Sequence, residues 1–397
     1  MKRTAIFLIL FICSIAARTQ VNTDSCTMEI SLITCAPGTD LYSIFGHTAI
    51  RVKDARRSMD IIYNYGTFDD SDPLFYIHFM RGIMVYSLSA ETFNDFMQEY
   101  NYEHRSVLAQ VLDLTCAEKN KLYEALRTNT LEENRFYDYH FHTDNCTTRA
   151  GRIIESNTMD SFSYKNILPN HGPSYRDMIH EYLNRQHQHW SGFGIDILLG
   201  MNLDIKPDNI EAIHFLPDYL FRGMDSARSG NKPLVLEKKI LLDFPQTRIP
   251  SAWFTPVAVF TSVLILFTGL FFLRNHPAAK RILMISDIVF FSLLGLTGIL
   301  MASMWLGRVD NVCRNNINIL WALPTHLAAV FYIRKKAGWV KYYFLITAIF
   351  AVGLLAGFPW WPQRMNAAVI PILIIILFRS FHLFQNRNHA EKTIVQG

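Results

Sequence analysis

The hydrophobic and polar positions divide this chain into two unlike halves. Between residues 20 and 250, charged residues are interspersed with aromatic ones, as in a soluble domain. From residue 253 to 384, Leu, Ile, Phe, Val, Ala and Trp dominate. Because a helix needs about 20 mostly apolar residues to cross a bilayer, the second half predicts five transmembrane helices. The expected spans are residues 254–273, 282–306, 317–333, 342–358 and 366–384.

Within the soluble half, short alternating runs predict strands and longer periodic runs predict helices. The expected strands are residues 28–36, 47–53 and 59–65, with 83–88 as a fourth candidate and 134–142 as an extended aromatic block. The expected helices are residues 89–103, residues 116–130 and a segment from about Asn145 through Ile154. Strands come first and a helix follows them, so this order predicts an α+β domain.

The N-terminus predicts export. Lys2 and Arg3 precede a short apolar run that ends in small residues at Ala16 and Ala17, which is typical of a secretory signal peptide. We expect residues 1–17 to form this signal. Cys13 leaves a lipoprotein signal open as an alternative, and an uncleaved peptide would serve as an extra membrane anchor.

The charges between the apolar stretches predict the orientation. If the soluble domain of residues 18–250 lies outside, the cytoplasmic segments 274–281, 334–341 and 385–397 carry nine Lys and Arg, against three in the outer loops. Positively charged loops stay on the cytoplasmic side of a membrane. The charge count and the signal peptide therefore agree, and residues 385–397 are expected to form a cytoplasmic tail after the bundle of residues 253–384.

The remaining composition narrows the function further. The net charge is only +4, and the positive residues form no single soluble patch, so we expect no nucleic-acid partner. Six cysteines are present. Outside the cytoplasm disulfides are permitted, so Cys26 and Cys35 could pair, although a domain of this size could also keep them free.

The chemistry starts from Cys146, which follows an aromatic extended run and begins an expected helix. The backbone N–H groups and the positive dipole end of a helix stabilise a thiolate and lower the pKa of its cysteine. A nucleophilic thiol also needs a base and a group that orients the base. His47, which opens the second strand, is the expected base. Asn64 on the next strand is the expected orienting group, with Tyr63 and Tyr65 as alternatives.

A polar cluster interrupts the membrane half. Asn316, Asn318, Trp321, Pro324 and His326 lie in or just before the third expected span. Asn318 and His326 are eight residues apart, roughly two helical turns, and are expected to share a face. Two explanations stay open: hydrogen bonding between helices, and contact with a lipid headgroup or with the soluble domain.

Other polar residues fit weaker hypotheses. Arg81, Arg105 and Arg149 could bind phosphate groups, but structural ion pairs explain them as well. His140 and His142 could face one side of a strand, yet no metal-binding pattern supports them, so no metal and no cofactor are expected. The aromatic stretches 75–86 and 136–141 could line a groove for acyl chains or pack in the core, and Arg379 and His382 could reach the membrane interface from the fifth span.

The order of these motifs resembles the circularly permuted papain-like enzymes of the NlpC type, which include lecithin:retinol acyltransferase. In both, a His is followed by a polar residue on the next strand and then by an Asn-Cys step at a helix start. More closely, the whole mature chain resembles the lipoprotein N-acyltransferase family called Lnb. The similar stretches are LITCAPG at 32–38, YSIFGHTAIR at 42–51, YNYGTFD at 63–69, NRFYDYHF at 134–141, DNCTTR at 144–149, FGIDILLG at 193–200, FLPDYL at 215–220, and NxNxxWxxPxH at 316–326.

The resemblance implies a permuted papain-like periplasmic domain followed by an α-helical transmembrane bundle. It implies a monomer in the bacterial inner membrane that moves an acyl chain from a phospholipid, through a thioester on Cys146, to the α-amino group of a diacylglyceryl-cysteine lipoprotein. The Cys146 backbone N–H and Tyr42 are the expected oxyanion donors. Asn145, Arg149 and His326 are further candidates for substrate binding.

Two other functions compete with this one. The same Cys146–His47 pair could hydrolyse a peptide, an amide or the cell wall, although a wall hydrolase needs at most one span. A membrane sensor or assembly factor with a decayed site would instead keep Cys146 buried and unreactive.

Overall fold

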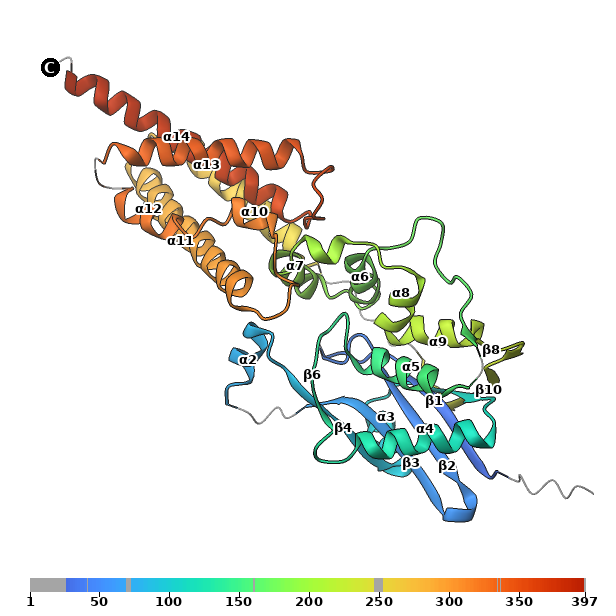
Figure 1. The fold of residues 1–397 in the computed structure, drawn as a ribbon. Coiled ribbons are helices and arrows are strands. Elements are labelled where there is room, and N and C mark those ends of the chain that lie inside the picture. Colours follow the sequence, from blue (N-terminus) through green and yellow to red (C-terminus); the bar gives the residue numbers. More distant parts are fainter. Residues whose placement is uncertain are drawn as a thin grey trace, which may run out of the picture.

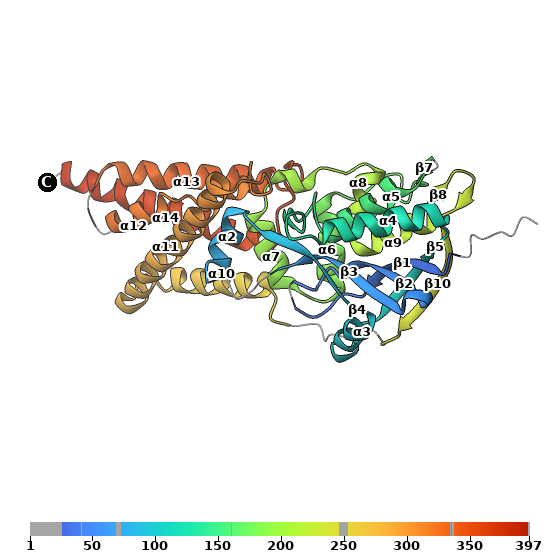
Figure 2. The same ribbon diagram turned by 60° about the horizontal axis from the view of Figure 1, so that its bottom comes forward.

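The computed structural model of the chain describes residues 26–395, apart from residues 41, 69–72, 160, 246–252, 334 and 336. The expected signal peptide lies outside these described residues. A sheet-containing unit at one end and a helical bundle at the other are joined through α6 (Tyr175–Arg185) and α7 (His189–Leu198), which lie between them in both views (Figures 1 and 2). The architecture is therefore an α+β domain followed by a helical region.

A seven-stranded antiparallel sheet forms the first unit, in the order β10-β5-β1-β2-β3-β4-β6. The strands are β1 Met28–Cys35, β2 His47–Asp54, β3 Met59–Thr67, β4 Val85–Thr92, β5 Val107–Leu112, β6 Phe136–Asp138 and β10 Val235–Leu242. A small second sheet contains β7 Phe162–Ser163, β8 Arg228–Ser229 and β9 Lys232–Pro233.

Helices cover both faces of the large sheet. Alternate residues of β1 enter different cores: Ile33 packs with Phe96 of α3, and Leu32 packs with Ile154 of α5. Because both faces are covered, nearly every position of the central strands β1 and β2 is buried, and not only alternate ones. The helices of this unit are α2 Phe75–Arg81, α3 Phe93–Tyr102, α4 Cys116–Asn129, α5 Cys146–Asn157, α6 Tyr175–Arg185, α7 His189–Leu198, α8 Asn209–Phe215 and α9 Pro217–Ser226, with short 3-10 turns at η1 Ala55–Arg57 and η2 Met201–Asp204.

The sequence predicted most of these elements. β1, β2, β3 and α4 are confirmed, and Thr115 and Glu118 form a capping box at the start of α4. The expected helix over 89–103 is wrong at its start, because residues 89–92 pair with β3 and α3 begins only at Phe93, capped by Thr92. The block 134–142 contains only the short strand β6.

The second unit contains α10 Pro256–Phe272, α11 Pro277–Gly307, α13 Trp339–Ala356 and α14 Val369–Val395. Among the described residues, α11 and α13 are long and apolar enough to cross a membrane, and α10 and residues 369–385 are shorter apolar helices. α14 packs against both α13 and α10.

The third expected span is not one helix. It consists of a 3-10 turn, η3 Ile317–Leu320, and the short helix α12 His326–Tyr332. The Asn316 side chain accepts from the Asn318 N–H and caps η3, and Pro324 has no N–H to continue a helix. The prediction that Asn318 and His326 share a helical face is therefore wrong.

Two further expectations change. Cys26 and Cys35 are both free; Cys35 ends β1 and Cys26 precedes it, so the extended strand keeps them about 30 Å apart at roughly 3.3 Å per residue. Arg379 does not extend to the interface, because its guanidinium pairs with Asp287 of α11 at 2.7 and 2.8 Å and is buried.

Candidate active site

Cys146 occupies the first position of α5. The preceding Asn145 caps this helix: its Oδ1 accepts from the Thr148 N–H at 2.9 Å, and its Nδ2 donates to the carbonyls of Phe141 and Phe215. These bonds fix where the helix begins and place Cys146 in its first turn. Cys146 is partly exposed, so a nucleophile here combines helix-dipole stabilisation with access.

The start of α5 packs directly on the strands that carry the other site residues. The hydroxyls of Thr147 on α5 and Thr48 on β2 lie 3.2 Å apart and hydrogen-bond. On β3, Gly66 has a φ of +95°, and a Cβ added there would lie 3.5 Å from the Cys146 Cβ. The glycine therefore allows a backbone conformation that residues with a Cβ rarely adopt, at the point where β3 passes Cys146.

His47 is the first residue of β2 and lies beside Cys146. Its Nε2 is 3.1 Å from the Asn64 Oδ1 on β3. An amide oxygen can only accept, so the imidazole donates here and Nδ1 is left for the thiol. His47 lies close enough to Cys146 that each side chain shifts the pKa of the other. The structure thus brings together the three residues that the sequence singled out from three different elements.

A fourth side chain continues this row on β4. The Asn64 Nδ2 donates to the Glu91 Oε1 at 2.5 Å. An ionised carboxylate can only accept hydrogen bonds, so Glu91 faces the amide nitrogen of Asn64. The Asn64 oxygen is thereby kept turned toward His47. Glu91 is not among the residues predicted from the sequence, because residues 89–92 were expected to be helical. The alternation within β4, and the Ile62–Glu91 pairing that places Glu91 beside Asn64, would have identified it.

The electrostatics favour a charged pair. Burial raises the pKa of the Cys146 thiol, but the adjacent His47 and the hydrogen bonds from His47, the Thr48 backbone and Thr147 outweigh it, so the net pKa lies below the ordinary value of 9.0. Burial lowers the pKa of His47, yet Cys146 and the bond to Asn64 raise it above 6.5 overall. Both shifts favour proton transfer from the thiol to the imidazole.

The alternatives to Asn64 have other contacts. The Tyr65 hydroxyl accepts from the Asn129 Nδ2 at 2.8 Å, on the α4 side of the sheet. Tyr63 is buried in the same core. Neither ring is needed to orient His47, because the amide of Asn64 already fills that position.

The other predicted site residues have mainly structural contacts. All polar atoms of the Asn145 amide are engaged in the helix cap. Arg149 forms a two-bond ion pair with Asp144 at 2.8 and 2.7 Å and lies 3.6 Å above the Tyr137 ring. Tyr42 is 66% exposed, stands edge-on to Phe68 and lies near Asp40.

His326 lies in the helical unit on α12. Its Nε2 is 3.2 Å from the Trp321 carbonyl and its Nδ1 is 2.7 Å from the Tyr343 hydroxyl. The ring is fully buried and also packs on Phe291. The structure therefore places it among helices of the bundle and not beside the thiol.

The polar cluster before α12 contacts the soluble domain. The Asn318 Nδ2 donates to the Asp196 carbonyl at 2.9 Å, and the Asn316 Nδ2 donates to the Ile197 carbonyl at 2.6 Å. Gln363 donates to the Leu199 carbonyl at 3.1 Å. Of the two explanations left open, contact with the soluble domain accounts for both asparagines.

A buried arginine supports the same contact from the soluble side. Arg176 of α6 is fully buried, and it pairs with Asp196 of α7 at 3.1 Å and with Asp204 at 2.9 Å. It also donates to the carbonyls of Leu199 and Gly200. These ion pairs and hydrogen bonds of Arg176 fix the end of α7, where the bundle docks on it.

Arg105 and His142 are further polar candidates named from the sequence. Arg105 pairs with Glu103 at 2.7 Å, as a structural ion pair would. Burial lowers the pKa of His142. In the described part of the chain, no group of three or more His, Cys, Asp or Glu side chains is arranged to hold a metal ion.

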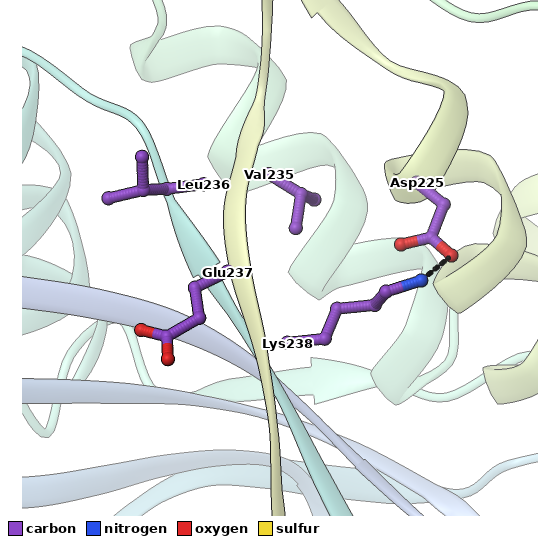
Figure 3. A pocket seen from close by; sticks show the side chains of 5 residues that line it. All are labelled: Asp225, Val235, Leu236, Glu237 and Lys238. Carbon is purple, nitrogen blue, oxygen red and sulfur yellow. Dashed lines mark hydrogen bonds and ion pairs between the residues drawn. The ribbon is translucent and has the colours of Figure 1, made fainter.

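A hollow elsewhere on the molecule is separate from this site. It lies beside β10 and is lined by Asp225, Val235, Leu236, Glu237 and Lys238, with Lys238 and Asp225 paired at 3.0 Å (Figure 3). β10 is an outer strand, separated from β2 by β5 and β1. The hollow therefore has no contact with the His47–Cys146 pair.

Comparison with known families matches both units. A family model described as the Lnb N-terminal periplasmic domain matches residues 16–186, which include His47, Asn64 and Cys146. A second model, described as the Lnb transmembrane domain, matches residues 248–389. A comparison with curated proteins and one with solved structures each found no match.

Proposed function

The chain belongs to the Lnb family and is a membrane protein with a periplasmic domain. From this premise we propose that it is a lipoprotein N-acyltransferase. The acyl donor is a membrane phospholipid, and the acceptor is the free α-amino group of a diacylglyceryl-cysteine lipoprotein. The observation that carries the proposal is the adjacent His47–Cys146 pair at a helix start, in a domain bound directly to a transmembrane unit.

The first half of the reaction acylates the enzyme. His47 removes the proton of the Cys146 thiol, and the thiolate attacks an ester carbonyl of the phospholipid. The tetrahedral intermediate collapses with loss of the lysophospholipid alkoxide, which takes the proton from His47. A thioester remains on Cys146. Splitting the transfer in this way is the usual advantage of a covalent nucleophile.

The second half transfers the chain to the lipoprotein. The neutral α-amino group attacks the thioester carbonyl, an amide bond forms, and the carbon–sulfur bond breaks. His47 takes the proton from the attacking amine and returns it to the Cys146 sulfur. Donor and acceptor are both lipids, which explains why the thiol domain is docked on a bundle instead of a single anchor.

Several residues support these steps without forming the bond. Asn64 holds His47 in the tautomer that leaves Nδ1 facing the thiol. The Cys146 backbone N–H, unpaired within the helix because it lies in the first turn, is the first oxyanion donor. The exposed Tyr42 supplies a second donor when its side chain turns from Asp40 toward the site.

The arrangement also supports a permuted papain-like fold, in which His precedes Cys along the chain. We place the protein as a multi-pass monomer of the bacterial inner membrane, with the catalytic domain in the periplasm. Positive charges in the inner loops and exposed aromatic residues at the outer ends of the helices support this orientation.

The test is the N-terminal mass of a lipoprotein in cells that depend on this enzyme. Cys146→Ala is expected to leave the lipoprotein diacylated with a free amine, because the thioester cannot form. Cys116→Ala is the matched control, since Cys116 is likewise the first residue of a helix, α4, outside the site. Undiminished N-acylation with Cys146→Ala would overturn the proposal.

A further inference from the structure

An exposed apolar patch surrounds α2. The four α2-region side chains are between 40% and 51% exposed, and two side chains at the end of α11 are 85% and 60% exposed. The residues of this α2 patch are Leu74, Ile77, Phe79, Met80, Leu306 and Val309. Contiguous apolar surface of this kind marks a contact with a partner or a membrane.

The patch is fixed to the end of a membrane helix. The Arg308 Nη1 donates to the Phe79 carbonyl at 2.7 Å, and the Val309 N–H donates to the Arg81 carbonyl at 3.0 Å. Arg308 also pairs with Asp310, and a Cβ at Gly82 would lie 2.9 Å from that carboxylate. α2 therefore sits beside the point where α11 ends, as both ribbon views show (Figures 1 and 2).

This end of the bundle has the features of a membrane boundary. Trp253, just before α10, is 88% exposed, and Trp360, just after α13, is 80% exposed. Tryptophan favours the headgroup level of a bilayer. The charge distribution of the loops makes this the outer side, which is the side of the soluble domain.

A row of stacked aromatic side chains leads from α2 to the thiol. Phe75 of α2 stacks on Phe68 at 5.9 Å, Phe68 on Tyr86 at 5.1 Å, and Tyr86 on Tyr139 at 4.2 Å, measured between ring centroids. Tyr86, Tyr139 and Cys146 pack on the same core. These four rings, named here the aromatic row, are all only partly buried.

We infer that α2 inserts into the outer leaflet and that the aromatic row guides the donor acyl chain from the leaflet to Cys146. The inference rests on the proposed function and names its donor path. With the ester at Cys146, the chain lies along Tyr139 and Tyr86, and its end reaches Phe68 and Phe75 beside the lipid tails. The occupant of the α2 patch is phospholipid, because the patch is continuous with the lipid-facing end of α11.

The first test is photo-crosslinking in phospholipid nanodiscs with the full-length Cys146→Ala protein, which binds donor without turnover. A phospholipid with a diazirine at the chain terminus is expected to label residues 68 and 73–80. One with the diazirine next to the ester is expected to label 86 and 137–146. Labels confined to α10–α14 with both probes would overturn the inference.

The second test compares two donors with the otherwise wild-type enzyme. Ile77→Glu combined with Phe79→Glu is expected to slow acylation of Cys146 by bilayer phospholipid about tenfold, since charge opposes insertion of an apolar face. The rate of acylation by a water-soluble short-chain ester is expected to stay within about twofold of the wild-type rate, because His47 and Cys146 are unchanged. Equal loss with both donors, or no loss with either, contradicts the inference.

The matched control is Leu236→Glu combined with Ile240→Glu. These side chains are each 68% exposed on β10, away from the bundle. The control therefore replaces two exposed apolar side chains by Glu, as the α2 variant does, and acylation by both donors is expected to keep its wild-type rate. Failure of the proposed function is distinguishable, because wild-type Cys146 would then form no thioester with either donor while α2 could still be labelled in the bilayer.

Discussion

Cys146 and Cys35 lie close enough for their charges to interact, yet their surroundings move the two thiol pKa values in opposite directions. Cys35 ends β1, opposite His47 in the β1–β2 register, and burial raises its pKa to about 12. Cys146 instead lies beside the His47 imidazole at the first turn of α5, and its pKa is lowered. Of the two neighbouring thiols, Cys146 is therefore the one that ionises at the lower pH.

This contrast predicts the pH dependence of alkylation. The rate of iodoacetamide labelling at Cys146 rises as pH passes through the thiol pKa, so its lowered pKa puts this rise below 9.0. Replacing His47 with Gln removes the stabilising charge and is expected to move the rise to higher pH. Peptide mass spectrometry separates the sites, and Cys35 is the internal control that stays unlabelled. Unchanged Cys146 titration with His47→Gln contradicts the assignment.

Glu91 is predicted to act as a positioning residue through Asn64. Glu91→Gln keeps an acceptor oxygen and is expected to retain activity within about twofold, whereas Glu91→Ala frees the amide to rotate and is expected to cost roughly tenfold or more in kcat. The decisive measurement is the pH dependence of kcat. If the Asn64 amide no longer holds His47 in place, the raised pKa of the imidazole is expected to fall toward its ordinary value. Equal effects of both variants would show that the carboxylate only packs.

At the scale of elements, the docking of α7 on the segment before α12 explains why the third apolar stretch does not form a helix. Asn316 and Asn318 direct their amides to carbonyls at the end of α7, which requires an irregular backbone there. The hydropathy pattern gave no sign of this, because the apolar residues around the turn are buried between the two units.

Gly200 provides a test of this contact with a control nearby. A Cβ at Gly200 would lie 1.7 Å from the Arg314 carbonyl oxygen, so Gly200→Ala is expected to push the two units apart and lower Tm by several degrees. In α7 itself, Gly194 has nothing within 4 Å of its added Cβ. Gly194→Ala is expected to stabilise by up to about 1 kcal/mol. If both variants melt like the parent, the docking contact is not structural.

The same elements show what the sequence could predict. Alternation located β1, β2 and β3, and helical periodicity located α4. The strand character of residues 89–92 was hidden for two reasons. The segment VYSLSAET contains few large apolar residues, and its last residue, Thr92, is a good cap for the helix that follows. His47, Asn64 and Cys146 could be chosen from residue type and element order, whereas Glu91 required the β3–β4 register.

At the scale of the whole molecule, a buried ion pair joins distant parts of the bundle. Asp287 of α11 and Arg379 of α14 are each 2% exposed. From the sequence, Arg379 looked like a residue near a helix end, since its partner is 92 positions away. Such pairs in a low-dielectric interior fix which helices meet, and breaking one leaves an uncompensated charge.

Arg379→Ala or Asp287→Ala is therefore expected to destabilise the bundle by about 3–5 kcal/mol. The double variant Asp287→Leu with Arg379→Met removes both charges at similar volume and is expected to recover most of that loss. Thermal unfolding in detergent measures all three proteins. Single variants as stable as the parent would show that the pair does not hold α11 and α14 together.

The central claim is that a phospholipid acylates Cys146. The purified full-length protein in phospholipid nanodiscs, without lipoprotein acceptor, is digested and the Cys146 peptide is weighed. We expect one fatty acyl group on this peptide, released by hydroxylamine as a thioester would be and absent when His47 is replaced by Gln. An unmodified Cys146 peptide from enzyme that still N-acylates lipoprotein would contradict it.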